Sequence, residues 1–214
     1  MIDDIVKEMK EKVDGYPIDP ENITITTICS HSSLQIFEAA RRSGFRTLGI
    51  IKEKDKEVRK SYDYMPRAKP DDFVTVETYL ALLEQSWSVW KHKPIFIPHG
   101  SGVEYLRIPD GSHHGLELLE IPTYGNRRII PWEFSREKQR QWLETEAGLL
   151  MPREIKYPEE IDGPVIIKRK GAAGGKGAVI LASKTEYSAF IQTQNLDEYK
   201  GCTMQQFISG TRYY

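Results

Sequence analysis

The sequence predicts an α/β protein: a doubly wound parallel sheet followed by a smaller α+β region. Strand and helix patterns alternate through about residue 100, which is typical of parallel sheets. From Pro164 the pattern changes to strand, glycine-rich loop and strand. Apolar residues make up 39% and charged residues 29% of the 214 residues, as in ordinary globular proteins.

The first region begins with apolar residues at helical spacing, which predict a helix over 2–14. A β-branched run predicts a buried strand over 23–29. The helix that follows is expected to end at Gly44, because glycine suits the left-handed position after a helix. The charged stretch 52–60 predicts a solvated face or a mobile loop.

The other elements follow from the same periodicities. The sequence predicts strands over 45–51, 73–76, 94–98, 116–122, 164–170, 178–182 and 203–208, and helices over 78–90, over 135–147 with Gly148 after it, and from the capping box at Ser183.

Several function classes are disfavoured by composition. The formal net charge of -1 offers no general attraction for nucleic acid. No apolar stretch approaches the roughly 20 residues of a membrane span, and the charged amino terminus is no signal peptide, so we expect a cytoplasmic protein. Cys29 and Cys202 have no CxxC neighbour and are expected to be buried thiols. The pair His113-His114 predicts loop residues and no metal site, because adjacent side chains point apart.

The glycine-rich hairpin is the most informative stretch. Residues 171–177 read Gly-Ala-Ala-Gly-Gly-Lys-Gly and follow three basic residues, 168–170. Their backbone N–H groups can converge on an anion. The spacing is not that of a Walker loop, and the flanking strands exclude a GxGxxG turn. Such a hairpin is typical of the phosphate lid of ATP-grasp enzymes and protein kinases; the alternative is a surface turn with incidental lysines.

Motifs along nearly the whole chain, in order, resemble one family. The matching segments are Ser30-His31-Ser32-Ser33-Leu34, Gly44-Phe45-Arg46-Thr47, His99-Gly100-Ser101 with Val103-Glu104-Tyr105, Tyr124-Gly125-Asn126-Arg127 with Trp132-Glu133, and 164–177. The sequence is similar to the archaeal PurP family, the ATP-grasp, formate-dependent FAICAR synthetases of purine biosynthesis. The resemblance implies a Rossmann-like, pre-ATP-grasp domain over 1–126 and the amino-terminal lobe of an ATP-grasp domain over 127–214.

The resemblance also implies an activity. Such ligases use ATP and formate to formylate AICAR, a ribonucleotide monophosphate, through formyl phosphate, and release FAICAR, ADP and phosphate. The family's AICAR-contacting histidine and serine correspond to His31 and Ser101. Ser32 would lie beside His31 at a helix N-terminus, where anions are favoured. Without the resemblance, the serines of 30–33 would be helix caps and His99 a loop histidine bonded to backbone.

The ATP site implied by the resemblance lies in the second region. Its residues would be Lys168, Gly171, Gly174, Gly175, Lys176, Gly177, Gln206, Phe207 and Ile208. Lys168 is a partner for the α- and β-phosphates. Gln206 stands where ATP-grasp proteins usually place a glutamate, so adenine contacts would be altered or made by backbone groups. Arg127, Arg128 and Arg136 are open to two interpretations: phosphate contacts, or a solvated helix start.

The expected metal is Mg²⁺ bound with ATP, and its ligands in this fold lie after residue 214. The chain alone is therefore expected to be inactive, as part of a longer synthetase or a drifted paralogue, and no catalytic residue is assigned. The family tends toward homo-oligomers. Two other functions remain open: an ATP-grasp ligase joining a different carboxylate and amine, and a non-catalytic nucleotide-binding module.

Overall fold

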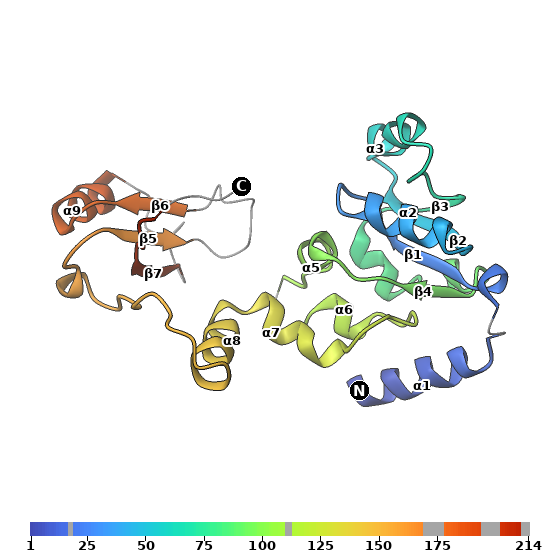
Figure 1. Ribbon diagram of the computed structural model, residues 1–214, viewed down its shortest axis with the longest axis horizontal. Helices are drawn as coiled ribbons and strands as arrows, with labels where there is room; N and C mark the ends of the chain where they lie inside the picture. Colours follow the sequence, from blue (N-terminus) through green and yellow to red (C-terminus); the bar gives the residue numbers. More distant parts are fainter. Residues whose placement is uncertain (17–18, 110–112, 169–177, 194–201, 211–214) are drawn as a thin grey trace. The chain divides into compact units, whose positions relative to one another are not determined.

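A computed structural model describes the chain except for residues 17–18, 110–112, 169–177, 194–201 and 211–214 (Figure 1). It divides into two compact units, Met1–Gln139 and Arg140–Tyr214. The domain boundary expected after residue 126 stays a prediction. Each unit is described by itself below.

The first unit is built on a four-stranded parallel sheet with the order β3-β2-β1-β4 (Figure 1). Its strands are β1 (Thr24–Ile28), β2 (Arg46–Lys52), β3 (Asp72–Val76) and β4 (Pro94–Phe96). The chain moves outward from β1 to β3 and then returns to the other side of β1. This reversal makes a topological switch point between β1 and β4, where doubly wound folds bind ligands. The predicted parallel α/β class is confirmed.

The helices of the first unit are short, apart from α1 (Ile2–Asp14) and α2 (Ser33–Arg42). The short ones are η1 (Pro20–Asn22), α3 (Lys56–Ser61), η2 (Tyr62–Tyr64), η3 (Tyr79–Leu83), α4 (Trp87–Trp90), α5 (Gly100–Tyr105), α6 (Gly115–Leu118), η4 (Arg127–Ile129), α7 (Ile130–Phe134) and α8 (Arg136–Gln141), whose last two residues belong to the second unit. Gly44 follows α2 with a φ of +83°, which confirms its expected place after the helix.

Both faces of the parallel sheet are covered, as the unbroken apolar pattern of β2 requires. Leu48 and Ile50 belong to the larger core cluster on one face. On the other face, Ile51 packs with Cys29, Phe37 and other residues of a smaller cluster under α2. Successive residues of a strand point to opposite faces, which explains this division.

Three predicted elements are corrected by the structure. The helix expected over 78–90 is interrupted: η3 ends at Leu83 and α4 begins at Trp87, and both Leu82 and Val89 reach the core. For the stretch 52–60, the mobile-loop interpretation is wrong where α3 begins, and the solvated-face interpretation agrees with the exposure of residues 56–60. The strand expected over 116–122 begins as helix α6, and only Thr123 forms a bridge, parallel to Phe96 of β4.

The helix α6 forms because His114 caps it. The His114 ring Nδ1 accepts a hydrogen bond from the Leu116 N–H at 3.1 Å, and the His114 N–H donates to the Glu117 carboxylate at 2.9 Å. This reciprocal capping box gives hydrogen-bond partners to the N–H groups of His114 and Leu116 at the start of the helix. Leu116 and Leu119 then lie three residues apart and are both buried, so the apolar run follows helical spacing.

The second unit contains an antiparallel sheet with the order β6-β5-β7. Its elements are β5 (Val165–Lys168), β6 (Ala178–Leu181), α9 (Lys184–Thr193) and β7 (Thr203–Gln206), preceded by a π-helical turn, η5 (Trp142–Glu146), and by η6 (Pro158–Glu160). Val165 and Ile167 join a small core with Leu181. The two strands predicted on either side of the glycine-rich segment are confirmed by the antiparallel pairing of β5 with β6, and the segment itself lies outside the described residues.

Within the described residues, no helix combines the length and apolar character that a bilayer crossing requires.

Candidate functional site

Two loops meet at the carboxyl edge of the parallel sheet. The serine loop (residues 30–33) follows β1 and leads into α2, and the His99 loop (residues 97–101) follows β4 and leads into α5. The Thr27 hydroxyl donates to the Ile97 carbonyl at 2.7 Å, and His99 Nε2 donates to the Ile28 carbonyl at 3.0 Å. These bonds tie the His99 loop to the end of β1, so the structure brings the predicted binding segments together at the switch point.

The serine loop holds its own shape through Ser33. The buried Ser33 hydroxyl donates to the Ser30 carbonyl at 2.6 Å and accepts from the Ser30 N–H at 3.0 Å. It also lies 2.6 Å from the Tyr62 hydroxyl. Ser33 therefore stabilises the loop from within, and the Ser30 hydroxyl adds a bond by accepting from the Ser32 N–H at 3.2 Å. The interpretation of these serines as side-chain caps of α2 is wrong, because the N-cap residue, Ser32, makes no side-chain capping bond.

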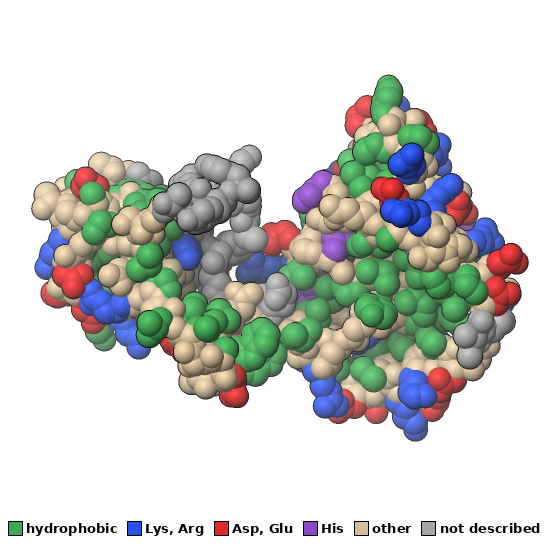
Figure 2. Space-filling view, viewed as in Figure 1, with side chains coloured by type: hydrophobic (Ala, Val, Ile, Leu, Met, Phe, Trp, Pro, Cys, Tyr) green, Lys and Arg blue, Asp and Glu red, His purple; other side chains and the backbone are tan. Residues whose placement is uncertain are grey.

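The two predicted ligands of this loop remain at the surface. His31 is exposed and Ser32 is half-buried. Ser32 precedes α2, yet its side chain makes no capping hydrogen bond to the helix. Figure 2 shows histidine side chains at the surface of the first unit near the beginnings of α2 and α5. His31 and Ser32 are thus accessible to a ligand at the start of a ten-residue helix, where partial positive charge favours an anion.

His99 positions Ser101 rather than facing outward. Its Nδ1 accepts a hydrogen bond from the Ser101 N–H at 3.2 Å and caps α5. Burial lowers the pKa of His99, its bond to the Ile28 carbonyl opposes this shift, and the nearby His31 adds to it. The ring is therefore neutral, with its proton on Nε2. The interpretation of His99 as a loop histidine bonded to backbone is confirmed, and Ser101 is half-buried in the first turn of α5.

His114 repeats this arrangement at the next helix. Its Nε2 donates to the Val103 carbonyl of α5 at 2.5 Å while Nδ1 caps α6. Burial lowers its pKa as well. His114 is therefore a buried cap and not an open loop residue. Among the described residues, no three histidine, cysteine, aspartate or glutamate side chains gather as a metal site.

We expect the stability of the first unit to fall in mild acid. The unfolded chain takes up protons on histidine near pH 6.5, whereas folding holds the pKa values of His99 and His114 lower. The stabilisation is complete above the unfolded pKa and is lost as pH falls through the folded values. Urea unfolding at pH 7.5 and 5.5 should show a loss on the order of 1 kcal/mol. The double variant His99→Asn/His114→Asn should flatten this dependence; an equally steep slope in it would exclude both histidines as the cause.

The three arginines considered as phosphate contacts differ in their surroundings. Arg127 is buried and donates to the Leu116 carbonyl at 3.1 Å, the Leu119 carbonyl at 2.5 Å and the Ile121 carbonyl. Burial lowers its pKa to about 10. The exposed Arg128 pairs with Asp3 of α1. The Arg136 side chain lies outside the described residues. Arg127 therefore serves the fold, a role that its place in a basic pair did not indicate.

In the second unit, Lys168 ends the central strand β5. Val165 and Ile167 are buried, whereas Ile166 and Lys168 are half-buried and lie on the opposite face. Lys168 pairs with Ala178 of β6 and Thr203 of β7. It thus lies where the predicted hairpin loop begins. The expected phosphate-binding residues Gly171, Gly174, Gly175, Lys176 and Gly177 lie outside the described residues.

The segment expected to meet adenine ends β7. The Gln206 N–H donates to the Arg153 carbonyl at 2.7 Å, and the Phe207 N–H donates to the Pro164 carbonyl at 2.8 Å. Gln206 and Ile208 are exposed, and Phe207 is half-buried. Because two of the three N–H groups already bond to the protein, adenine contacts through this backbone would use carbonyl groups or the Ile208 N–H.

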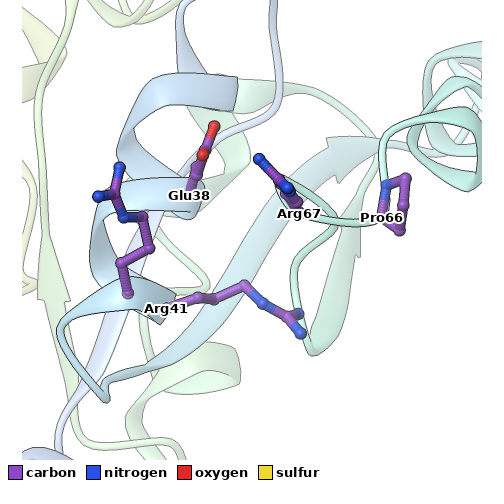
Figure 3. A pocket seen from close by; sticks show the side chains of 5 residues that line it. Glu38, Arg41, Pro66 and Arg67 are labelled. Carbon is purple, nitrogen blue, oxygen red and sulfur yellow. The ribbon is translucent and has the colours of Figure 1, made fainter.

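The first unit contains a separate pocket of about 630 Å³. It is lined by Glu38, Arg41, Arg42, Pro66 and Arg67 (Figure 3). Its arginines on α2 are in the last turn, where positive charge complements the helix dipole. Arg41 is held by the Lys69 carbonyl at 2.7 Å and by the Asp71 carboxylate at 2.9 Å. His31, Ser32 and Ser101 are not among the described residues that line this pocket.

Solved structures with this fold are enzymes that are distant in sequence. N5-carboxyaminoimidazole synthetase from Staphylococcus aureus, in complex with ADP, aligns with 86% of this chain and 47% of that chain, at a TM-score of 0.57 and 13% identity. An ADP complex of the purK N5-carboxyaminoimidazole ribonucleotide synthetase aligns with 91% of this chain and 49% of that chain, at a TM-score of 0.58 and 12% identity. These matches establish the fold.

Closer relatives come from archaea. The 5-formaminoimidazole-4-carboxamide-1-(beta)-D-ribofuranosyl 5'-monophosphate synthetase of Methanothrix thermoacetophila is 46% identical over 208 residues, which are 97% of this chain and 54% of that protein. The enzyme of the same name from Methanosarcina acetivorans is 45% identical and covers 92% of this chain and 51% of its own length. The chain thus spans about half the length of these relatives.

A family model described as a protein of unknown function, DUF1246, matches residues 25–155, more than half of the chain. The chain therefore belongs to the DUF1246 family and to the archaeal PurP family that its motifs resemble.

Proposed function

We propose that this chain supplies the AICAR-binding unit and the first part of the ATP-binding lobe of a formate-dependent FAICAR synthetase. The observation that carries the proposal is 46% identity, over 97% of the chain, to a protein named as that synthetase. A formate oxygen would attack the γ-phosphorus of ATP and release ADP. The AICAR 5-amino group would then attack the formyl carbon, lose a proton and release phosphate. We propose Mg²⁺ as the ion accompanying ATP, the cytoplasm as the location, and homo-oligomers as the assembly.

In this proposal the first unit binds AICAR at the switch point. His31 and Ser32 offer a surface imidazole and hydroxyl at the start of α2, and Ser101 offers a hydroxyl on the joined His99 loop. A helix N-terminus favours the phosphate of a mononucleotide. Because burial keeps His99 neutral, this ring adds no positive charge to the site.

The second unit would bind ATP. Lys168 supports this role by its place at the end of β5, beside the first residues of the predicted phosphate lid. A positioned cation offsets charge on the transferred phosphoryl group. The exposed Gln206 favours a second candidate, a nucleotide-binding module without catalysis, because an amide cannot replace the charge of a carboxylate.

The test measures ligand-dependent stability and turnover. AICAR at 100 times its dissociation constant should raise the unfolding free energy of the chain by about 2.7 kcal/mol. His31→Ala and Ser101→Ala should remove most of this gain, whereas Ser43→Ala, an exposed serine after α2, should keep it. Lys168→Ala should weaken ATP binding roughly tenfold, with the exposed Lys184→Ala as control.

Turnover is measured on the full-length protein with formate, ATP and AICAR. FAICAR formation that depends on all three supports the ligase. ATP binding without product, under conditions where AICAR also fails to stabilise the chain, would favour the non-catalytic module. Product formed only with another carboxylate or amine would identify a different ATP-grasp ligase.

A further inference from the structure

Lys52 occupies a confined position at the carboxyl edge of the parallel sheet. It is the last residue of β2, and its side chain is only 24% exposed. Its amino group lies 5.1 Å from the centre of the Tyr79 ring and 5.8 Å from that of Tyr105. The two rings stack at 5.0 Å with an interplanar angle of 13°. Aromatic faces attract a cation and limit the positions of the lysine chain.

Lys52 and Tyr105 belong to elements that adjoin the two loops of the candidate site. Tyr105 follows Ser101 by four residues in α5, so both lie on one face of that helix. β2 is the neighbour of β1, and the Cys29 N–H donates to the Ile50 carbonyl at 2.8 Å just before the serine loop. Lys52 therefore stands at the strand end beside the serine loop and contacts the helix that carries Ser101.

Lys52 forms an ion pair with Asp55, at 3.3 Å. Asp55 precedes α3, but its side chain makes no capping hydrogen bond to that helix. The carboxylate is thus not needed to cap α3. A phosphate carries up to two negative charges and three acceptor oxygens, so it can displace a partly exposed carboxylate from an ammonium group that has three donors.

We propose that Lys52 binds the 5′-phosphate of the mononucleotide, and that Asp55 holds the ammonium group in place until the phosphate displaces it. This inference rests on the proposed function, because it assigns part of the same substrate. It makes opposite predictions for the two members of the pair. Removing Lys52 weakens phosphate binding, and neutralising Asp55 strengthens it because a competitor is gone.

The experiment compares AICAR with its nucleoside, which lacks the phosphate, by calorimetry on the full chain. Lys52→Met should weaken AICAR binding roughly ten- to hundredfold and leave nucleoside affinity within about twofold. Asp55→Asn should tighten AICAR binding by roughly twofold to tenfold. Lys54→Met, an exposed lysine two residues further on, should behave as wild type.

The possible outcomes distinguish a failure of the Lys52 inference from a failure of the proposed function. If Lys52→Met weakens both ligands equally, or if Asp55→Asn weakens AICAR binding as Lys52→Met does, the pair serves only the fold and the inference is wrong. If the wild type and Lys52→Met bind AICAR equally while His31→Ala does not bind it, the proposed function stands without Lys52. If the wild type does not bind AICAR, the proposed function fails and this inference fails with it.

Discussion

Arg127→Met is expected to lower the free energy of unfolding of the first unit by about 2–4 kcal/mol. The guanidinium donates to carbonyls of Leu119 and Ile121 and to the Thr123 hydroxyl at 2.9 Å. The Ile121 carbonyl also accepts from the Thr123 hydroxyl at 2.9 Å, so the loss is expected mainly at the Leu119 carbonyl, to which Arg127 donates. Each buried carbonyl left unpaired costs about 1–3 kcal/mol, which exceeds what is recovered by no longer desolvating the cation.

Urea unfolding followed by circular dichroism measures this loss. The matched control is Arg128→Met, because Arg128 is the adjacent residue, is exposed, and pairs with an exposed Asp3. Surface ion pairs contribute about 0–1 kcal/mol. Equal losses in the two variants would mean that Arg127 does not hold the segment between α6 and η4.

Gly49→Ala is expected to destabilise the first unit by about 1–3 kcal/mol through overpacking. A Cβ at this position would lie 2.7 Å from Cys29 Sγ, 3.0 Å from Pro70 Cγ and 3.1 Å from the Phe73 ring. Cys29 is buried and directly precedes the serine loop. The displaced thiol should therefore also disturb the loop, so AICAR affinity should fall together with stability.

The cause can be isolated with a double-mutant cycle. Cys29→Ala removes the nearest atom, so Gly49→Ala should cost about 1 kcal/mol less in that background than in the wild type. Gly15→Ala is the control, because its added Cβ would meet nothing closer than 3.5 Å. An unchanged cost in the Cys29→Ala background would show that Pro70 or Phe73 sets the limit instead.

The parallel sheet could be predicted because its signals are local. The β-branched run of β1, the following helix and Gly44 each show in a few consecutive residues. The segment 115–123 could not be predicted in the same way, because its leucines suit a strand or a helix equally. His114 and Arg127 decide the outcome, and their hydrogen-bond partners are known only once the chain is folded.

The candidate site was predictable in part for a similar reason. His31 and Ser101 follow neighbouring parallel strands, so they meet at one edge once β1 pairs with β4. Lys52 begins a charged stretch that looks solvated in the sequence. Its confinement depends on Tyr79 and Tyr105, which are distant along the chain. The glycine hairpin was identified from composition, and its phosphate-binding role stays a prediction.

The bond from His99 to the Ile28 carbonyl has a consequence for cooperativity. The Ile28 carbonyl at the end of β1 accepts the hydrogen bond of His99, and the chain continues through Cys29 into the serine loop, so the two loops share one anchoring peptide group. A ligand that orders one loop reduces the conformational entropy that is lost when the ligand also binds the other loop. Successive contacts along a single substrate can therefore reinforce each other without any rearrangement of the backbone.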